Sequence, residues 1–151
     1  MHSQKLIHSL SSQWPATLPG VVRLGIDLVH VPRIAESLRD FGDRFAQRLF
    51  TEAEIAYAQG SEAERDARFA ARFAAKEATI KALSLSEAGV NWRDMEVLRA
   101  DDGSCAMVLR GEALVAARAL RINRVLVCLS HDGDYAAAVV AALSDTDEPP
   151  P

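Results

Sequence analysis

The stretch Arg72-Phe73-Ala74-Ala75-Lys76-Glu77-Ala78-Thr79-Ile80-Lys81-Ala82 decides the fold, because it sets charged side chains within a strongly helical segment. Alanine, phenylalanine, lysine and glutamate, without glycine or proline, predict one long helix from about Arg65 to Leu83. At about 100° per residue, Glu77 falls beside the helix face that carries Phe69 and Phe73. A carboxylate in such surroundings loses hydration, so it needs a charged partner or a metal.

Glu77 also has an ordinary explanation within its own helix. Lys81 follows it by one turn, and a glutamate placed one turn before a lysine stabilises a helix by about 0.2–0.5 kcal/mol. The helix alone therefore leaves two interpretations open, a surface ion pair or part of a functional site.

The composition is that of one globular domain. The chain has 151 residues, of which 49% are hydrophobic and 25% charged, so it can bury a core without disulfide bonds. Its two cysteines, Cys105 and Cys128, fit no metal or redox spacing, which favours a reducing, cytoplasmic setting. A net charge of -4 argues against nucleic-acid binding, and no apolar run is long enough to suggest a membrane span.

The two ends differ from the middle of the chain. Polar residues interrupt residues 1–20, which make a poor signal peptide and are expected to form a flexible extension. Residues 144–151 are rich in aspartate and proline and are expected to be a disordered tail. The folded domain is therefore expected to cover residues 21–143.

The predicted order is one strand, several helices, and then strands around one more helix, which indicates an α+β domain. Helices are expected over residues 32–41, 51–60 (with Thr51 and Glu54 as a capping box), 65–83 and 111–120, with a short turn over 45–49. Strands are expected over residues 21–31, 92–100, 104–109, 124–129 and 135–143.

Asp27 stands out because it interrupts the apolar run from Leu24 to Val29, and with Glu77 it has the most apolar surroundings of the acids. Burying such an acid is costly unless it is paired or binds a cation, although an aspartate near a strand end can also cap a backbone N–H. Two carboxylates, completed by water and phosphate oxygens, would suit Mg²⁺. Lys81 could then neutralise phosphate charge.

The sequence contains no familiar phosphate-binding loop. Its glycines match neither a Walker A motif nor GxGxxG, and there is no GxSxG elbow and no His/Cys metal cluster. His131 follows a predicted strand, where a histidine by itself is more often a surface turn residue than a catalyst. Any phosphate chemistry must therefore rest on a carboxylate-held metal and basic side chains.

Six segments occur in an informative order. They are Gly25-Ile26-Asp27-Leu28-Val29, Arg33-Ile34, Phe50-Thr51-Glu52-Ala53-Glu54, the helix segment Arg72 to Ala82, Trp92-Arg93-Asp94-Met95-Glu96-Val97, and Leu129-Ser130-His131 with Asp134-Tyr135-Ala136. Over about residues 24–140, this set resembles the holo-acyl-carrier-protein synthase group of 4'-phosphopantetheinyl transferases. The resemblance implies the 4'-phosphopantetheinyl transferase fold, a mainly antiparallel sheet packed with a long helix.

The family transfers the phosphopantetheine arm of coenzyme A to a serine of an acyl carrier protein and releases adenosine 3',5'-bisphosphate. By resemblance, Asp27 and Glu77 are the Mg²⁺ ligands. Glu77 and Lys81 are implied to be catalytic, with Lys81 near the pyrophosphate. The positions implied to bind coenzyme A are Arg72, Lys76, Lys81, Ser130 and His131.

The resemblance also implies partners. Family members are homotrimers with active sites between subunits, and the carrier docks an acidic helix on the segment that here carries Arg33, Arg44 and Arg48. Acidic residues are interspersed in that segment, so a solvated helix face is the alternative interpretation of these arginines.

The sequence departs from the family where Leu83-Ser84-Leu85-Ser86 replaces a Gly-Thr-Gly turn, and at His30 and Cys128. None of these departures alters the two acids or Lys81. Two other functions stay open: a non-catalytic homologue that binds the carrier or coenzyme A, and a metal-dependent hydrolase of a nucleotide or pyrophosphate. The carrier could serve fatty-acid, polyketide or peptide synthesis.

Overall fold

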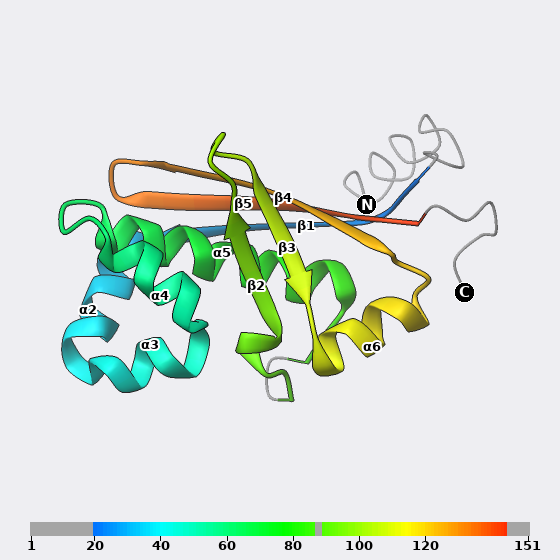
Figure 1. Ribbon diagram of the computed structural model, residues 1–151, viewed down its shortest axis with the longest axis horizontal. Coiled ribbons are helices and arrows are strands. Elements are labelled where there is room, and N and C mark those ends of the chain that lie inside the picture. Colours follow the sequence, from blue (N-terminus) through cyan, green and yellow to red (C-terminus); the bar gives the residue numbers. More distant parts are fainter. Residues whose placement is uncertain (1–19, 87–88, 145–151) are drawn as a thin grey trace, which may run out of the picture.

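The computed structural model describes residues 20–86 and 89–144 (Figure 1). Five antiparallel strands form one sheet in the order β1-β5-β4-β3-β2, and the long helix α5 packs along it. This architecture confirms the expected α+β fold. The predicted extension over 1–20 and the predicted tail over 144–151 lie outside the described residues, except for Gly20 and Ser144.

The elements follow the predicted order, and α3 is a helix where only a short turn is expected from the sequence. The strands are β1 (Val21–His30), β2 (Met95–Arg99), β3 (Cys105–Leu109), β4 (Arg124–Asp132) and β5 (Tyr135–Leu143). The helices are α2 (Val31–Phe41), α3 (Asp43–Leu49), α4 (Glu52–Gln59), α5 (Arg65–Leu83), α6 (Gly111–Ala119) and the 3-10 turn η1 (Trp92–Asp94). Within the described ranges, no helix has the length and apolar character needed to cross a membrane.

Two predicted strand boundaries are wrong. The strand predicted over 92–100 begins instead as the turn η1, because the Asn91 side chain accepts a hydrogen bond from the Arg93 N–H and caps that turn. Strand β4 runs beyond its predicted end, since His131 still pairs with Ala136 in the ladder with β5. His131 therefore lies on a strand and not in the hairpin turn.

Helix α5 lies against the sheet at short range. Ala70, Ala74 and Ala78 are fully buried. A Cβ atom built on Gly25 of β1 would lie 1.9 Å from the Ala78 carbonyl oxygen, so only glycine permits this approach without moving the backbone. The contact fixes β1, and with it Asp27, against the second half of α5.

The opposite face of the sheet exposes large apolar side chains, and we call it the outer sheet face. It comprises Leu24, Ile26, Leu28, Leu126 and Val139. Ile26 is 64% exposed and lies opposite Val139 in the register of β1 and β5. A contiguous apolar patch of this kind normally marks a surface that another molecule covers.

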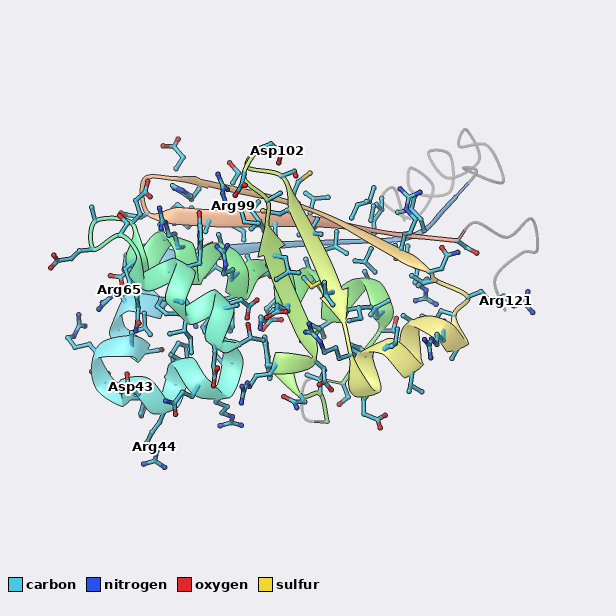
Figure 2. All side chains as sticks on the ribbon, in the orientation of Figure 1. Asp43, Arg44, Arg65, Arg99, Asp102 and Arg121 are labelled. Atoms are coloured by element: carbon cyan, nitrogen blue, oxygen red, sulfur yellow. The ribbon has the colours of Figure 1, made fainter. Side chains whose placement is uncertain are left out.

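Helices α2 and α3 form a projecting corner of the molecule. Gly42, with φ of 56°, separates them. Arg44 extends outward from this corner (Figure 2), Asp43 before it is exposed, and Phe41 is 65% exposed. The corner therefore offers both charged and apolar side chains to a partner.

Candidate active site

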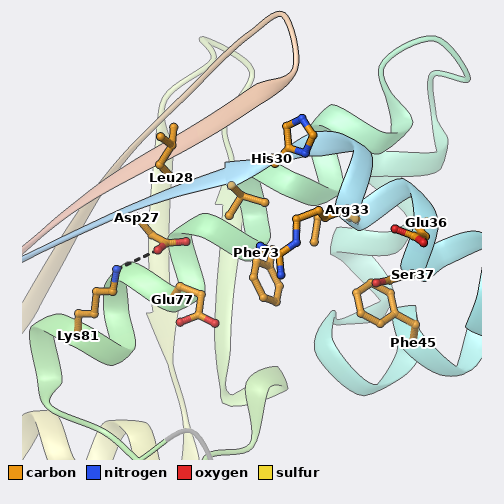
Figure 3. Close-up of a pocket in the computed structure, with 12 residues that line it drawn as sticks. Asp27, Leu28, His30, Arg33, Glu36, Ser37, Phe45, Phe73, Glu77 and Lys81 are labelled. Atoms are coloured by element: carbon orange, nitrogen blue, oxygen red, sulfur yellow. Dashed lines mark hydrogen bonds and ion pairs between the residues drawn. The ribbon is translucent and has the colours of Figure 1, made fainter.

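Asp27, Glu77 and Lys81 lie in one pocket (Figure 3). The pocket has a volume of about 660 Å³ and opens beside β1, the end strand of the sheet, where α2 and α5 approach it. Asp27 faces α5 because side chains alternate along a strand and Gly25 already touches that helix. The structure thus brings together the three residues predicted to hold the metal and to act in catalysis.

Lys81 joins the strand to the helix. Its Nζ donates hydrogen bonds to Asp27 Oδ1 at 2.9 Å and to the Ile26 carbonyl oxygen at 3.0 Å. The Asp27 side chain is 16% exposed and that of Lys81 is 54% exposed. The carboxylate is therefore shielded from water while the lysine remains accessible to a ligand.

The donor atoms of this pocket suit Mg²⁺. Asp27 and Glu77 line the pocket from two different elements, and Mg²⁺ commonly takes one or two protein carboxylates together with water and phosphate oxygens. In the part of the chain that the structure describes, no group of three or more His, Cys, Asp or Glu residues could hold a metal. The two acids therefore fit a hard cation shared with a phosphate ligand better than a closed protein cage.

The arginines predicted to meet the carrier lie on one surface that begins at the pocket. Arg33 lines the pocket itself. Arg44 and Arg48 line an adjoining hollow of about 620 Å³ with Phe41, and Phe45 lines both hollows. We call Arg33, Arg44 and Arg48, which are all exposed, the basic surface.

Of the residues predicted to bind coenzyme A, only Lys81 lines the pocket of the two acids. Ser130 and His131 are exposed on β4, and β5 separates that strand from β1. Arg72 and Lys76 are also absent from the lining of the pocket: the Arg72 guanidinium lies 4.0 Å from the centre of the Tyr57 ring, and the Lys76 side chain is fully buried. One chain therefore does not collect all predicted contacts to coenzyme A around the two acids.

Burial lowers the pKa of both Arg72 and Lys76. The buried Nε of the Arg72 guanidinium has no hydrogen-bond partner. The nearby Glu54 carboxylate opposes the shift in the pKa of Lys76. Direct contact of either side chain with coenzyme A stays a prediction.

Two acids that the sequence does not single out are the most deeply buried. Glu54 and Glu96 are 1% and 7% exposed, whereas Asp27 and Glu77 are only partly buried. The capping box marks Glu54 only as a local helix cap, and the structure confirms that cap. Its further bonds come from Lys76 and Val97, which no local pattern reports.

Comparison with known proteins places this chain in a family. A model of the 4'-phosphopantetheinyl transferase superfamily matches residues 23–140, which contain α5 and β4. The chain belongs to this superfamily. The match confirms the resemblance drawn from the motifs and the prediction of a transferase.

Curated members of the superfamily match most of the chain. The holo-acyl-carrier-protein synthase of Koribacter versatilis is 48% identical over 121 residues, which cover 80% of this chain and 96% of the relative. The synthase of Gloeobacter violaceus is 42% identical over 123 residues, which cover 80% of this chain and 92% of the relative.

Solved structures of the superfamily share the fold. The Chronobacterium ammoniagenes ACPS–CoA complex matches with a TM-score of 0.72 at 35% identity, covering 80% of this chain and 95% of that chain. The Helicobacter pylori holo-acyl-carrier-protein synthase in complex with coenzyme A gives 0.69 at 26% identity, covering 79% and 98%. These matches confirm the predicted 4'-phosphopantetheinyl transferase fold.

Proposed function

We propose that this chain transfers the 4'-phosphopantetheine arm of coenzyme A to a serine of an apo acyl carrier protein, with Mg²⁺, and releases adenosine 3',5'-bisphosphate. The convergence of Asp27, Glu77 and Lys81 in one pocket, in a chain of this superfamily, carries the proposal. Relatives named holo-acyl-carrier-protein synthase, and neighbours solved with coenzyme A, support the choice of donor and acceptor.

Each residue of the pocket has its own task in this reaction. Asp27 and Glu77 would hold Mg²⁺, which when bound supplies positive charge against the pyrophosphate of coenzyme A. The accessible ammonium of Lys81 can turn from Asp27 to a phosphate oxygen and stabilise charge there. The serine Oγ bonds to the β-phosphorus, the bond from that phosphorus to the bridging oxygen breaks, and adenosine 3',5'-bisphosphate leaves. Glu77, acting through a water molecule, is the candidate base for the serine proton.

We infer that the working enzyme is a homotrimer with shared sites. Ser130 and His131 lie away from the pocket of the two acids, so a second copy would be needed to bring them to it. The outer sheet face offers exposed apolar side chains for such a contact. A contact between two different surfaces closes into a ring when the rotation per subunit permits it.

The basic surface supports an acidic helix of the carrier as the docking partner. Docking depends on local charge, so the net charge of -4 does not oppose it. Arg33→Glu should raise the KM for the carrier several-fold, and because Arg33 also lines the pocket of the two acids, the KM for coenzyme A should rise by a smaller factor. A KM for the carrier that equals that of the wild type across a range of salt would assign Arg33 to an ordinary solvated face.

Mass spectrometry of an apo carrier incubated with this chain, coenzyme A and Mg²⁺ tests the proposal. The carrier mass should rise by one phosphopantetheine only when Mg²⁺ is present, with an equal amount of adenosine 3',5'-bisphosphate. A hydrolase would release the bisphosphate without modifying the carrier, and a non-catalytic homologue would form no product. Either outcome would overturn the proposal.

The same assay shows which class of carrier protein the enzyme prefers. Carriers from fatty-acid, polyketide and peptide synthesis are compared by kcat/KM. We expect an acyl carrier, such as that of fatty-acid synthesis, to be preferred over a peptidyl carrier, in keeping with relatives named for the acyl carrier protein. We also expect the enzyme to act in the cytoplasm.

A further inference from the structure

Lys76 and Glu54 form a buried ion pair that the proposed chemistry does not use. The Lys76 Nζ donates to Glu54 Oε2 at 2.7 Å, to the Leu49 carbonyl at 2.6 Å and to the Trp92 carbonyl at 3.0 Å. Neither charged side chain has any exposed surface. The three oxygens come from the end of α3, from α4 and from η1, and they satisfy all three N–H groups of the ammonium.

Glu54 extends this pair into a network. Its Oε1 accepts from the Val97 N–H at 2.8 Å, and its Oε2 accepts from the Thr51 N–H at 2.9 Å. The Thr51 hydroxyl donates to Glu96, which also accepts from Arg110 at 2.9 Å. The network therefore ties α5 to α4, to β2 and to the residue that precedes α6.

Lys76 directly precedes Glu77 on α5. Successive helical residues point about 100° apart, so Lys76 points into the network while Glu77 lines the pocket with Asp27. A rotation of α5 by about 10° would move a side-chain atom about 6 Å from the helix axis by about 1 Å. A misplacement of about 1 Å at an active site can lower turnover by about 100-fold.

Trp92 links the network to the pocket a second time. Its carbonyl accepts from Lys76, and its ring stacks on Phe73 with centroids 5.4 Å apart. Phe73 lines the pocket beside Glu77. A shift of η1 would therefore move both the anchor of Lys76 and a wall of the pocket.

We propose that Lys76 is a positioning residue for Glu77, because its buried bonds to α3, α4 and η1 fix the rotation of α5 that places Glu77 in the lining of the pocket with Asp27. The inference rests on the proposed function, in which these two carboxylates hold Mg²⁺. It gives Lys76 a task different from direct contact with coenzyme A, and the two tasks predict different measurements.

Lys76→Met and Glu54→Gln in the full chain test the inference, with Thr79→Val as the matched control. Thr79 is fully buried on the same helix, and its hydroxyl donates to the Ala75 carbonyl of that helix at 2.8 Å. The control therefore alters a buried polar group of α5 without altering the network. The readouts are kcat, the KM for coenzyme A, and binding of Mn²⁺ in the presence of coenzyme A by electron paramagnetic resonance.

We expect kcat to fall by about tenfold or more and Mn²⁺ binding to weaken in both network variants. At saturating Mg²⁺, the KM for coenzyme A should stay within about twofold of the wild type, and Thr79→Val should behave as the wild type. Measurements are made below the onset of thermal unfolding of each variant. If Lys76→Met does not fold, Glu54→Gln decides the question, because glutamine keeps the volume and can still accept from the Val97 N–H.

Two outcomes overturn the inference. A large rise in the KM for coenzyme A with kcat retained would indicate that Lys76 contacts the coenzyme. A folded variant with unchanged kcat and unchanged Mn²⁺ binding would leave the network a purely structural role. A wild-type protein that neither binds Mn²⁺ nor transfers phosphopantetheine would instead refute the proposed function.

Discussion

Replacing Lys81 with methionine separates a structural role of its charge from a catalytic one. Methionine keeps the length and the helix propensity of lysine and removes the ammonium. In the structure that ammonium is bound to Asp27 Oδ1 at 2.9 Å and to the Ile26 carbonyl at 3.0 Å. The substitution therefore removes two bonds between α5 and β1 together with the positive charge in the pocket.

The structural effect should be small. The Lys81 side chain is 54% exposed, so water screens its pair with Asp27, and the free energy of unfolding should fall by only about 0–1 kcal/mol. For a domain of this size, such a loss lowers Tm by at most about 2–5 °C.

The catalytic effect should be much larger. Removal of one preorganised donor from a developing oxyanion raises the barrier by about 3–4 kcal/mol, which corresponds to a loss of about 10²–10³-fold in turnover. This rise in the barrier is several times larger than the expected fall in the free energy of unfolding. Turnover and Tm measured on the same Lys81→Met sample therefore distinguish the two roles.

Turnover is measured by mass spectrometry of the carrier at saturating coenzyme A and carrier, and Tm by circular dichroism. Arg118→Met is the matched control, because Arg118 is an exposed cation in the last turn of α6, outside the pocket. A Lys81→Met enzyme within about threefold of wild-type turnover would refute the catalytic role. Lys81 would then serve only to hold α5 against β1.

Three further changes test the metal, the assembly and the packing. Glu77→Gln removes one charged ligand with little change in volume, so transfer at limiting Mg²⁺ should fall by about 100-fold or more while Tm changes little; near wild-type transfer would contradict the metal assignment. Ile26→Glu places a charge on the outer sheet face, where the side chain is 64% exposed, and light scattering should show one chain mass in place of three, with loss of activity. An active variant of unchanged mass would argue against an interface at this face. Gly25→Ala sets a Cβ 1.9 Å from the Ala78 carbonyl oxygen and should lower the free energy of unfolding by about 1–3 kcal/mol, or more, in denaturant titration; an unchanged midpoint would show that α5 moves away at little cost.

Local patterns predicted most of the helices. Helix α5 has the predicted bounds, Arg65–Leu83, because no helix breaker interrupts its alanine-rich sequence. The capping box of Thr51 and Glu54 is also confirmed. A local pattern predicts it because all of its bonds lie within one turn. The sequence does not predict the turn at η1, because the Asn91 cap and the stacking of Trp92 on Phe73 compete with an apolar pattern that favours a strand.

The sequence predicts the residues of the site, but it does not predict that they lie in two separate places on the chain. Chemical type and apolar surroundings pick out Asp27 and Glu77, and the structure brings both to one pocket. No spacing rule could show that Ser130 would face away from that pocket, because its place depends on the strand order β1-β5-β4. The task proposed here for Lys76 depends likewise on bonds to three other elements.

The short motif Gly25-Ile26-Asp27 couples helix packing, the pocket and the outer sheet face. Gly25 and Asp27 share the inner face of β1, where one admits α5 and the other enters the pocket, and Ile26 points to the outer sheet face. A shift of the register by one residue would exchange the two faces, so helix packing, pocket and outer surface depend on the same pairing with β5. If the outer sheet face joins the subunits as proposed, the contact at Ile26 lies one residue from a metal ligand. Assembly of the trimer would then hold Asp27 in place directly. Loss of the subunit contact would therefore weaken metal binding at Asp27 first.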